Sequence, residues 1–413
     1  MRMNETQFVQ LKDRLQAVSE HSPFYRKKFA DCGFCPEDVK TPEDIVKIPF
    51  SSKEDLRNAY PLGLQAVPDE EIVRIHSSSG TTGLPVIIPY TRQDVDDWAT
   101  MMARCMTIAG VTNRDRVQIT PGYGLWTAGI GFQAGVERVG AMAVPMGPGN
   151  TEKQIQMMVD LQTTTLGATS SYALLLAEEI RKRGLKDKIA LKRGIIGSER
   201  WGDKMRDRIA TELDIDLYDI YGLTEIYGPG ISVSCKGKKE LHHFDDFVFF
   251  EVIDYETGLP VPDGEVGELV ITTLKKQGAP LLRYRTRDLT RLIPGECSCG
   301  LPYPRHDRII GRADDMTKVK GVNIYPAQID GLLSSIQGAS SEYQVVVDKI
   351  GGKDHMVLRF ERENGTDADA LHDLVQRQFK LKIGILIEVE ALPAGALPRS
   401  EKKTVRIIDH RYQ

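Results

Sequence analysis

The sequence of 413 residues contains no long hydrophobic run, no excess of positive charge and only six cysteines. No apolar stretch approaches the roughly 18 to 20 residues of a membrane-spanning helix, and the beginning, MRMNETQFVQLKDRL, lacks the apolar centre of a signal peptide. Because 54 Lys and Arg residues stand against 58 Asp and Glu residues, the chain offers no basic surface for a nucleic-acid backbone. We therefore expect a cytoplasmic protein that binds neither nucleic acid nor a membrane.

The cysteines are too few for a disulfide scaffold in a chain of this length, and a reducing cytosol would keep them as thiols or metal ligands. Four of them form two clusters, Cys32 with Cys35 and Cys297 with Cys299. The first pair, C-G-F-C, has redox-motif spacing but lies in a helical segment without the βαβ pattern that such a motif needs. We interpret that spacing as coincidental.

The order of helical and β-rich segments predicts a multidomain α/β fold. From residue 72 to 222, short β-rich runs alternate with helical stretches such as 92–109 and 204–213, which predicts a mostly parallel sheet. After residue 232, turns with β-rich flanks indicate a small antiparallel β subdomain. We predict a first domain over 1–311, a hinge at 312–315 and a small mobile α+β cap domain over 316–413.

A loop rich in Ser, Gly and Thr lies between two predicted strands, in H-S-S-S-G-T-T-G-L-P (76–85). Glycines let backbone amides converge on a phosphate and hydroxyls add donors, so such a loop can hold an anionic triphosphate. It is not a Walker A loop, because Leu84 and Pro85 follow the last glycine where that motif has a lysine. A flexible surface linker is the alternative.

Several motifs together resemble those of the acyl-adenylate-forming (AMP-binding) superfamily, and within it the phenylacetate-CoA ligase family. They follow the family's order along nearly the whole chain: SSGTTGLP (78–85), GYGLWTAGIG (122–131), GSERW (197–201), YDIYGLTEIYGPG (218–230), LLRYRTRDLTRL (281–292), GRADDMTKVKGVNIYP (311–326) and LPRSEKK (397–403). The resemblance implies activation of a carboxylic acid by ATP, with release of pyrophosphate, followed by transfer to a thiol.

The resemblance assigns the nucleotide-binding residues of this sequence. Taken alone, Glu225 could equally be a helix N-terminal acid; the resemblance makes it a magnesium ligand and Thr224 a donor to the α-phosphate. Tyr221 would stack on adenine, Asp288 would hold the ribose hydroxyls, and Arg312 would assist it. The remaining implied nucleotide-binding residues are Ser77, Ser78, Ser79, Gly80, Thr81, Thr82, Gly83, Gly197, Ser198, Glu199, Arg200, Asp219 and Gly222.

The C-terminal motif implies a catalytic lysine. Family members usually have Gly then Lys after P-R-S-E, whereas this chain has Lys402 then Lys403, and spacing favours Lys403. A cation there would bridge the carboxylate and the α-phosphate. The resemblance also implies that the cap rotates about Asp314, so that Lys320, Gly321 and Val322 would line the channel for the pantetheine of coenzyme A.

The acid-binding pocket and a metal site are further candidates. Tyr123 and Trp126 would suit a flat aryl acid, although simple core packing is equally consistent with them. The ligand set of a structural zinc site is present in three thiols, Cys235, Cys297 and Cys299, and one imidazole, His242 or His243. The alternative is that these thiols are reduced and bind no metal. We favour His242, because E-L-H resembles the family's G-L-H and the next residue of a strand points the other way.

We therefore predict an enzyme, an acid-thiol ligase that forms an aryl- or arylacetyl-CoA through an acyl-AMP. Its cofactors would be ATP, Mg²⁺, coenzyme A and structural Zn²⁺. The sequence leaves open whether the chain forms a homodimer. The nearest alternatives are a ligase that transfers the acyl group to a carrier protein and an enzyme that adenylylates a deazaflavin. A non-catalytic nucleotide-binding zinc protein is more remote, because it needs no mobile lysine.

Overall fold

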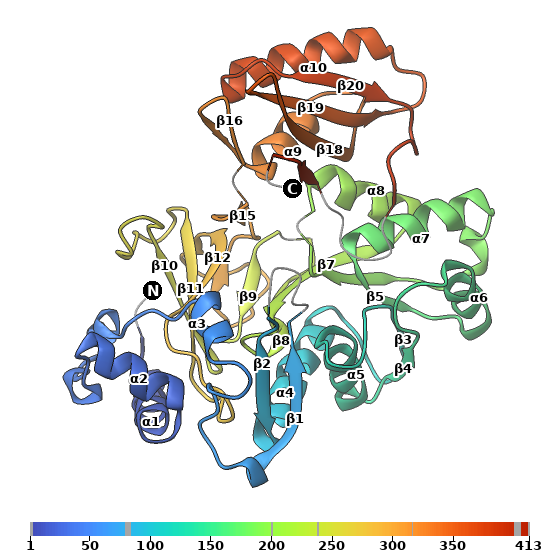
Figure 1. The fold of residues 1–413 in the computed structure, drawn as a ribbon. Helices are drawn as coiled ribbons and strands as arrows, with labels where there is room; N and C mark the ends of the chain where they lie inside the picture. Colours follow the sequence, from blue (N-terminus) through green and yellow to red (C-terminus); the bar gives the residue numbers. More distant parts are fainter. Residues whose placement is uncertain are drawn as a thin grey trace. The chain divides into compact units, whose positions relative to one another are not determined.

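The computed structural model describes residues 3–78, 84–199, 201–237, 239–315, 317–399 and 406–411, which form two compact units (Figure 1). The first unit comprises Met1–Ala168, Ile189–Ser198 and Asp216–Ile309, and the second comprises Thr169–Lys188, Glu199–Ile215 and Ile310–Gln413. Segments 169–188 and 199–215 thus group with the C-terminal residues, and the domain boundaries predicted from sequence stay a prediction. Within the described residues, no helix is both long and apolar enough to cross a bilayer.

The N-terminal segment of the first unit is helical, as the sequence predicts. Its helices are α1 (Glu5–His21), α2 (Pro23–Cys32) and α3 (Lys53–Asn58), with short 3-10 turns η1 (Pro36–Asp38), η2 (Pro42–Lys47) and η3 (Asp69–Glu71). Asn4 and Gln7 form a capping box at the start of α1, and Pro23 occupies the first turn of α2. Leu11 and Leu15 of α1 pack with Phe249 and Leu282, which attaches this segment to the rest of the unit.

One large mixed sheet forms the centre of the first unit. Its strands follow the order β13 (Leu292–Ile293), β14 (Arg305–His306), β9 (Leu241–His243), β8 (Gly228–Ser234), β7 (Asp216–Leu223), β6 (Arg193–Gly197), β5 (Thr165–Thr169), β3 (Arg116–Ile119) and β4 (Met142–Pro145). The β6–β7, β3–β5 and β3–β4 pairs are parallel, whereas β7 pairs with β8 antiparallel. The sheet therefore changes from parallel to antiparallel pairing at β7, where chain direction reverses after the YGLTE motif.

Helix α4 (Arg92–Ile108) leads from β2 of a separate hairpin into β3, whereas α5 (Ala128–Val139) and α6 (Thr151–Leu161) connect strands of this sheet. Helices α4 and α5 lie side by side (Figure 1), and a Cβ atom at Gly135 would come within 2.6 Å of the Met102 Cβ. Glycine is therefore required for the close approach of the two helices. The sequence predictions did not include α5, because Gly129, Gly131 and Gly135 lower its helix propensity.

Two smaller antiparallel sheets complete the first unit. Strands β1 (Ile72–Ser77) and β2 (Ile87–Thr91) form a hairpin on either side of the Ser/Gly/Thr loop. Strands β10 (Val248–Ile253), β11 (Gly267–Thr273) and β12 (Tyr284–Thr290) form the antiparallel subdomain that the sequence predicts. Every residue of β10 and β11 is buried, so these strands are covered on both faces.

The second unit contains α7 (Ser170–Lys182), η4 (Lys186–Lys188), α8 (Asp203–Leu213) and a separate α+β body, as the sequence predicts for the C-terminal part. The sheet of that body has the order β20 (Glu388–Leu392), β19 (Lys353–Arg362), β18 (Ala339–Ile350) and β21 (Ile407–Asp409). Helices α9 (Pro326–Ser334) and α10 (Ala368–Ile383) share its apolar core, and β15 (Gly311–Arg312), β16 (Thr317–Val319) and β17 (Val322–Ile324) precede it. The α/β fold class is thus confirmed.

Candidate active site

The YGLTE motif lies at the end of β7 and in the turn that follows it, residues 224–227. A Cβ atom at Gly222 would collide with the carbonyl oxygen of Gly228, so the tight return of the chain into β8 requires glycine at this position. In open sheets, ligands bind beyond the carboxyl ends of parallel strands, where strand order changes. Thr224 and Glu225 are at such a position.

The side chains of Thr224 and Glu225 contact residues from two other segments. The hydroxyl oxygens of Thr224 and Thr127 are 3.2 Å apart, which ties the turn to the residue just before α5. Glu225 is only 5% exposed, and its carboxylate lies 3.4 Å from the Lys53 Nζ. Lys53 opens α3, and sequence reasoning missed it because nothing in a helix so distant along the chain signals this contact.

Tyr221 and Asp288 are brought together, although 67 residues separate them. The Tyr221 hydroxyl donates to the Asp288 Oδ2 at 2.6 Å, and the Asp288 backbone N–H donates to the Thr286 hydroxyl at 3.0 Å. Asp288 is 6% exposed and lies on β12. A short hydrogen bond to a carboxylate is strong, so the tyrosine fixes the direction in which Asp288 presents its oxygens.

The predicted phosphate loop is described only at its beginning, since Ser79, Gly80, Thr81, Thr82 and Gly83 lie outside the described residues. The Ser77 N–H donates to the Leu125 carbonyl at 2.8 Å. The Ser78 N–H donates to the Val86 carbonyl at 3.0 Å, and the Val86 N–H donates to the Ser78 hydroxyl at 3.0 Å. These bonds fix both ends of the loop.

His76, one residue before the loop, supplies no positive charge near neutral pH. Its Nδ1 lies 3.1 Å from the Leu125 carbonyl oxygen, and burial lowers its pKa to about 4. A neutral ring with Nδ1–H donating to that carbonyl is consistent with this geometry. The anchoring of residue 125 therefore depends on His76 and Ser77 together.

The predicted acid-pocket residues differ in exposure. Trp126 is 50% exposed, whereas Tyr123 is half-buried against the main core. A Cβ at Gly122 would come within 2.7 Å of the Trp126 ring, so Gly122 is required for the ring's position. Burial raises the pKa of Tyr123 to about 12, and its buried hydroxyl has no partner within the described part of the chain. Tyr123 therefore packs in the core and can also border a pocket.

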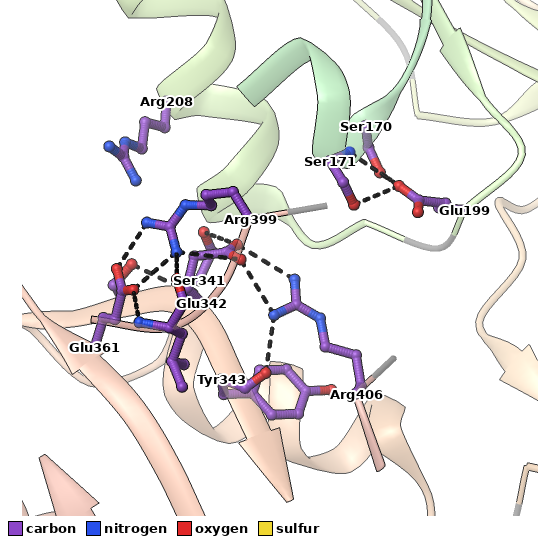
Figure 2. Close-up of polar contacts among 12 residues, drawn as sticks. Ser170, Ser171, Glu199, Arg208, Ser341, Glu342, Tyr343, Glu361, Arg399 and Arg406 are labelled. Carbon is purple, nitrogen blue, oxygen red and sulfur yellow. Dashed lines mark hydrogen bonds and ion pairs between the residues drawn. The ribbon is translucent and has the colours of Figure 1, made fainter. Parts of the chain in front are cut away.

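The GSERW motif is divided between the two units. In the first, Gly197 ends β6, where a Cβ would collide with the Ile220 carbonyl, and Ser198 has a left-handed φ of 69°. In the second, the Glu199 Oε2 accepts from the hydroxyls of Ser170 and Ser171 and from the Ser171 N–H, at 2.6–3.0 Å (Figure 2). Glu199 thus stabilises the N-terminus of α7.

Of two further residues in the predicted nucleotide-binding set, Asp219 and Arg200, the structure describes only Asp219. Asp219 lies on β7, where its backbone N–H donates to the Ser234 hydroxyl at 2.8 Å. Arg200 lies outside the described residues.

Arg312 and the predicted hinge residue Asp314 form an ion pair with each other. The Arg312 guanidinium donates to both carboxylate oxygens of Asp314 at 2.8 and 2.9 Å. Lys320 has a left-handed φ of 50°, its N–H donates to Asp354 at 3.0 Å, and its Nζ donates to the Leu386 carbonyl at 2.9 Å. Gly321 follows with a φ of 82°, so a strained tight turn joins β16 to β17.

Lys402 and Lys403 lie outside the described residues, but the chain on both sides of them is anchored. Arg399 donates to both oxygens of Glu361 at 2.8 Å and to both oxygens of Glu178 at 3.1–3.2 Å. Arg406 donates to the Glu342 carboxylate and, at 3.0 Å, to the Tyr343 carbonyl (Figure 2). Sequence reasoning missed this network, because its acids come from three distant elements.

Cys235, His242, Cys297 and Cys299 form one cluster in which all four ligand atoms lie within 4.8 Å of one another. The Cys235 and Cys297 sulfurs are 3.8 Å apart, and the Cys299 sulfur is 3.4 Å from the His242 Nε2. The other ring nitrogen of His242 lies 2.9 Å from the Tyr303 carbonyl. His243 instead stacks on Phe250 with ring centroids 4.2 Å apart, so His242 and not His243 belongs to the cluster, and its role as a metal ligand stays a prediction.

The thiols of this cluster have displaced pKa values. Burial raises the pKa of Cys235 to about 12. Burial also acts to raise the pKa of Cys297, but hydrogen bonds from Cys299, His242 and Cys235 outweigh it and lower that pKa to about 6. The cluster therefore contains one thiol that readily becomes a thiolate, the form that binds metals.

Comparisons with known proteins agree with the sequence motifs. Residues 23–274 match the family model of the AMP-binding enzymes, and residues 321–411 match that of the AMP-binding enzyme C-terminal domain. A phenylacetate-coenzyme A ligase of Pseudomonas putida is 41% identical over 418 residues, 99% of this chain and 94% of the relative. A phenylacetate-coenzyme A ligase of Escherichia coli (strain K12) is 39% identical over 415 residues, 98% of this chain and 94% of the relative.

A solved structure is similar over nearly the full chain. It is a 2-hydroxyisobutyryl-CoA ligase in the postadenylation state, in complex with R3-HIB-AMP. The TM-score is 0.88 at 29% identity, covering 98% of this chain and 89% of that one.

Proposed function

This chain belongs to the phenylacetate-CoA ligase family of AMP-binding, acyl-adenylate-forming enzymes, and from that premise we propose that it is an ATP-dependent ligase for an aryl or arylacetic acid. The acid and ATP would form an acyl-AMP with release of pyrophosphate, and coenzyme A would then displace AMP to give the thioester. The observation that carries the proposal is the end of β7, where Tyr221, bound to Asp288, is followed within four residues by Thr224 and Glu225.

The turn after β7 suits the reacting phosphates. Thr224 would donate its hydroxyl to the α-phosphate. Glu225, buried and close to Lys53, would hold Mg²⁺, which prefers one or two carboxylates together with phosphate oxygens. When bound there, Mg²⁺ would neutralise charge on the triphosphate.

The adenosine would lie against Tyr221 and Asp288. The Tyr221 ring supplies a face for adenine, and Asp288 supplies acceptors for the ribose hydroxyls. Gly197, Ser198 and Gly222 would lie around the base, and at both glycines a neighbouring backbone carbonyl of the protein leaves no room for a Cβ. Glu199, Arg200, Asp219 and Arg312 complete the proposed set, and the Ser/Gly/Thr loop from Ser77 to Gly83 would hold the β- and γ-phosphates.

Both half-reactions would use the C-terminal part of the chain. Lys403 would act in adenylation by binding the attacking carboxylate and the α-phosphate. Rotation of the cap about Asp314 would then bring Lys320, Gly321 and Val322 to the pantetheine. The strained turn at Lys320 and Gly321 supports a specialised role, since such backbone conformations concentrate at functional sites.

The cysteine cluster would hold one structural zinc ion. A tetrahedral site with Zn–S bonds of about 2.3 Å puts two sulfurs about 3.8 Å apart and a sulfur and an imidazole nitrogen about 3.6 Å apart. The separations of 3.8 and 3.4 Å fit that geometry, and the Tyr303 carbonyl can orient His242 from its other nitrogen. All four positions are taken by protein ligands, as in structural sites, so the ion would not act in the chemistry.

Product analysis tests the proposed function. With a panel of aryl and arylacetic acids, we expect acid-dependent release of AMP and pyrophosphate and formation of the corresponding acyl-CoA. Release of ADP and phosphate would contradict an adenylate intermediate. AMP release that requires a carrier protein in place of coenzyme A would favour transfer to that carrier. Pyrophosphate release with the AMP group retained on a deazaflavin would favour adenylylation of that cofactor.

A further inference from the structure

Lys276 is a fully buried lysine in the connection between β11 and β12 that the proposed chemistry does not use. Its side chain is 0% exposed, and its Nζ lies 4.1 Å from the centroid of the Tyr90 ring and 4.7 Å from that of Tyr227. The same Nζ donates a hydrogen bond to the Ile226 carbonyl oxygen. Burial lowers the pKa of Lys276 to about 7, although Asp94 and Glu225 act to raise it. An apolar side chain of similar length would fill the space without the cost of burying an amine that can carry a charge. The amine therefore needs an explanation beyond packing.

The side-chain contacts of Lys276 named above all lead to the turn that carries Thr224 and Glu225. Besides the Ile226 carbonyl, which binds Lys276, the Tyr227 carbonyl accepts from the Tyr90 hydroxyl at 2.9 Å. Tyr90 in turn packs its ring against the Lys276 ammonium. Lys276 and Tyr90 thus hold two successive carbonyl groups of the turn. The same turn carries the Thr224 hydroxyl, which lies beside Thr127, and the Glu225 carboxylate, which lies beside Lys53.

The backbone next to Lys276 is itself fixed. The buried Asp94 of α4 accepts from the N–H groups of Gln277 at 2.7 Å and Gly278 at 2.8 Å, and from the Thr91 N–H at 3.0 Å. A Cβ at Gly278 would come within 2.6 Å of the Pro89 carbonyl, so this connection has no space to shift. Lys276 therefore reaches the turn from a rigid base that also carries the strand of Tyr90.

We propose that Lys276 is a positioning residue for the adenylation half-reaction, which fixes the turn 224–227 from behind so that Thr224 and Glu225 face the reacting phosphates. This inference rests on the proposed function. The Lys276 amine donates to a carbonyl oxygen and also lies over two aromatic rings, and an apolar side chain of similar length would lose the hydrogen bond. Positional errors of about 1 Å at reacting groups can cost about 100-fold in rate, so a support of this kind matters to catalysis.

The test compares the two half-reactions of Lys276→Met. Adenylation is measured as acid-dependent ATP–pyrophosphate exchange over a range of Mg²⁺ concentrations, and thioester formation is measured from supplied acyl-AMP and coenzyme A. We expect exchange to fall about 10- to 100-fold and to require more Mg²⁺, whereas thioester formation stays within about twofold of wild type. The matched control is Lys275→Met, because Lys275 is partly exposed and pairs with Asp246 instead.

The outcomes separate this inference from the proposed function. No exchange in the wild-type protein contradicts the proposed function itself. Normal exchange in Lys276→Met, or an equal loss in both half-reactions, overturns the role of Lys276 while leaving the function standing.

If Lys276→Met does not fold, a second variant tests the proposal. Tyr90→Phe keeps the ring beside Lys276 and removes the hydroxyl, which donates to the Tyr227 carbonyl at 2.9 Å and lies 3.5 Å from the Thr224 carbonyl of the same turn. We expect about a 3- to 10-fold loss of exchange alone, since one neutral hydrogen bond contributes about 1 kcal/mol, which corresponds to about fivefold. Unchanged exchange, or an equal loss in both half-reactions, overturns the proposal.

Discussion

At the scale of single residues, the pair Tyr221 and Asp288 gives a direct test of nucleotide binding. Tyr221→Phe retains the ring and removes the 2.6 Å hydrogen bond to the Asp288 carboxylate. Because a hydrogen bond to a charged group contributes about 1.5 to 3 kcal/mol, we expect the KM for ATP to rise about 10-fold or more, with a smaller change in the KM for the acid. Steady-state kinetics with each substrate varied in turn measures the effect.

The neighbouring Tyr218 supplies the control for this substitution, because it lies on the same strand and we assign it no role in binding. Tyr218→Phe should leave the KM for ATP unchanged. If both variants raise that KM equally, the effect comes from β7 as a whole and not from Asp288.

At the scale of elements, the sequence predicts most helices and strands but not the partners of the site. The alternation of helical and β-rich segments predicts α4 and α8, whereas α5 is missed because its glycines serve close helix packing against α4. The residues of YGLTE and RTRD are predicted because they lie within motifs. The sequence does not predict the contacts of Lys53, Lys276 and Glu361. Each of these residues reaches its partner across more than 35 residues, and no local pattern indicates such a contact.

The anchoring of the segment before residue 400 gives a prediction at this scale. Glu361 is 1% exposed, and the two N–H groups of Arg399 bind both of its oxygens. Burial acts to raise the pKa of Glu361, but the bonds from Arg399 and nearby backbone N–H groups outweigh it, so the pKa is lowered. Removing Arg399 would leave a buried, unpaired carboxylate.

We expect Arg399→Ala to lower the free energy of unfolding of this unit by about 3 kcal/mol, measured by denaturant unfolding. The double variant Arg399→Ala, Glu361→Gln should recover part of that loss, because the uncharged amide is less costly to bury. Arg359→Ala is the control: its pair with Glu390 is more than one-third exposed on both sides and contributes about 1 kcal/mol or less. A loss in Arg399→Ala no larger than in this control would contradict the argument.

The lowered pKa of Glu361 also sets the direction of the pH dependence. A carboxylate whose pKa is lower in the folded state stabilises above its unfolded pKa, and this contribution is lost as pH falls through the folded value. The free energy of unfolding of the wild-type unit should therefore decrease as the pH falls below about 4.5. In Arg399→Ala this acid dependence should be weaker, because the ion pair that lowers the pKa is absent.

At the scale of the whole molecule, the proposed zinc site links parts of the first unit that are distant in sequence. Cys235 and His242 flank the entry into β9, whereas Cys297 and Cys299 lie in the loop between β13 and β14, about 60 residues later. A bound ion would close this long loop in the folded state, and metal binding contributes directly to folding free energy. Loss of the ion should then affect stability more than chemistry.

We expect about one zinc ion per chain by elemental analysis, and we expect Cys297→Ser to lose it and to melt several degrees lower. Bound zinc stabilises the folded state in proportion to its affinity, which falls as pH falls because the ligands must be deprotonated. The thermal stability of the zinc-loaded protein should therefore approach that of Cys297→Ser under acidic conditions or with a strong chelator. Cys32→Ser, at an exposed thiol outside the cluster, should keep both zinc and stability. Wild-type protein without stoichiometric metal, or a Cys297→Ser variant that retains it, would show that the four residues are held together by packing alone.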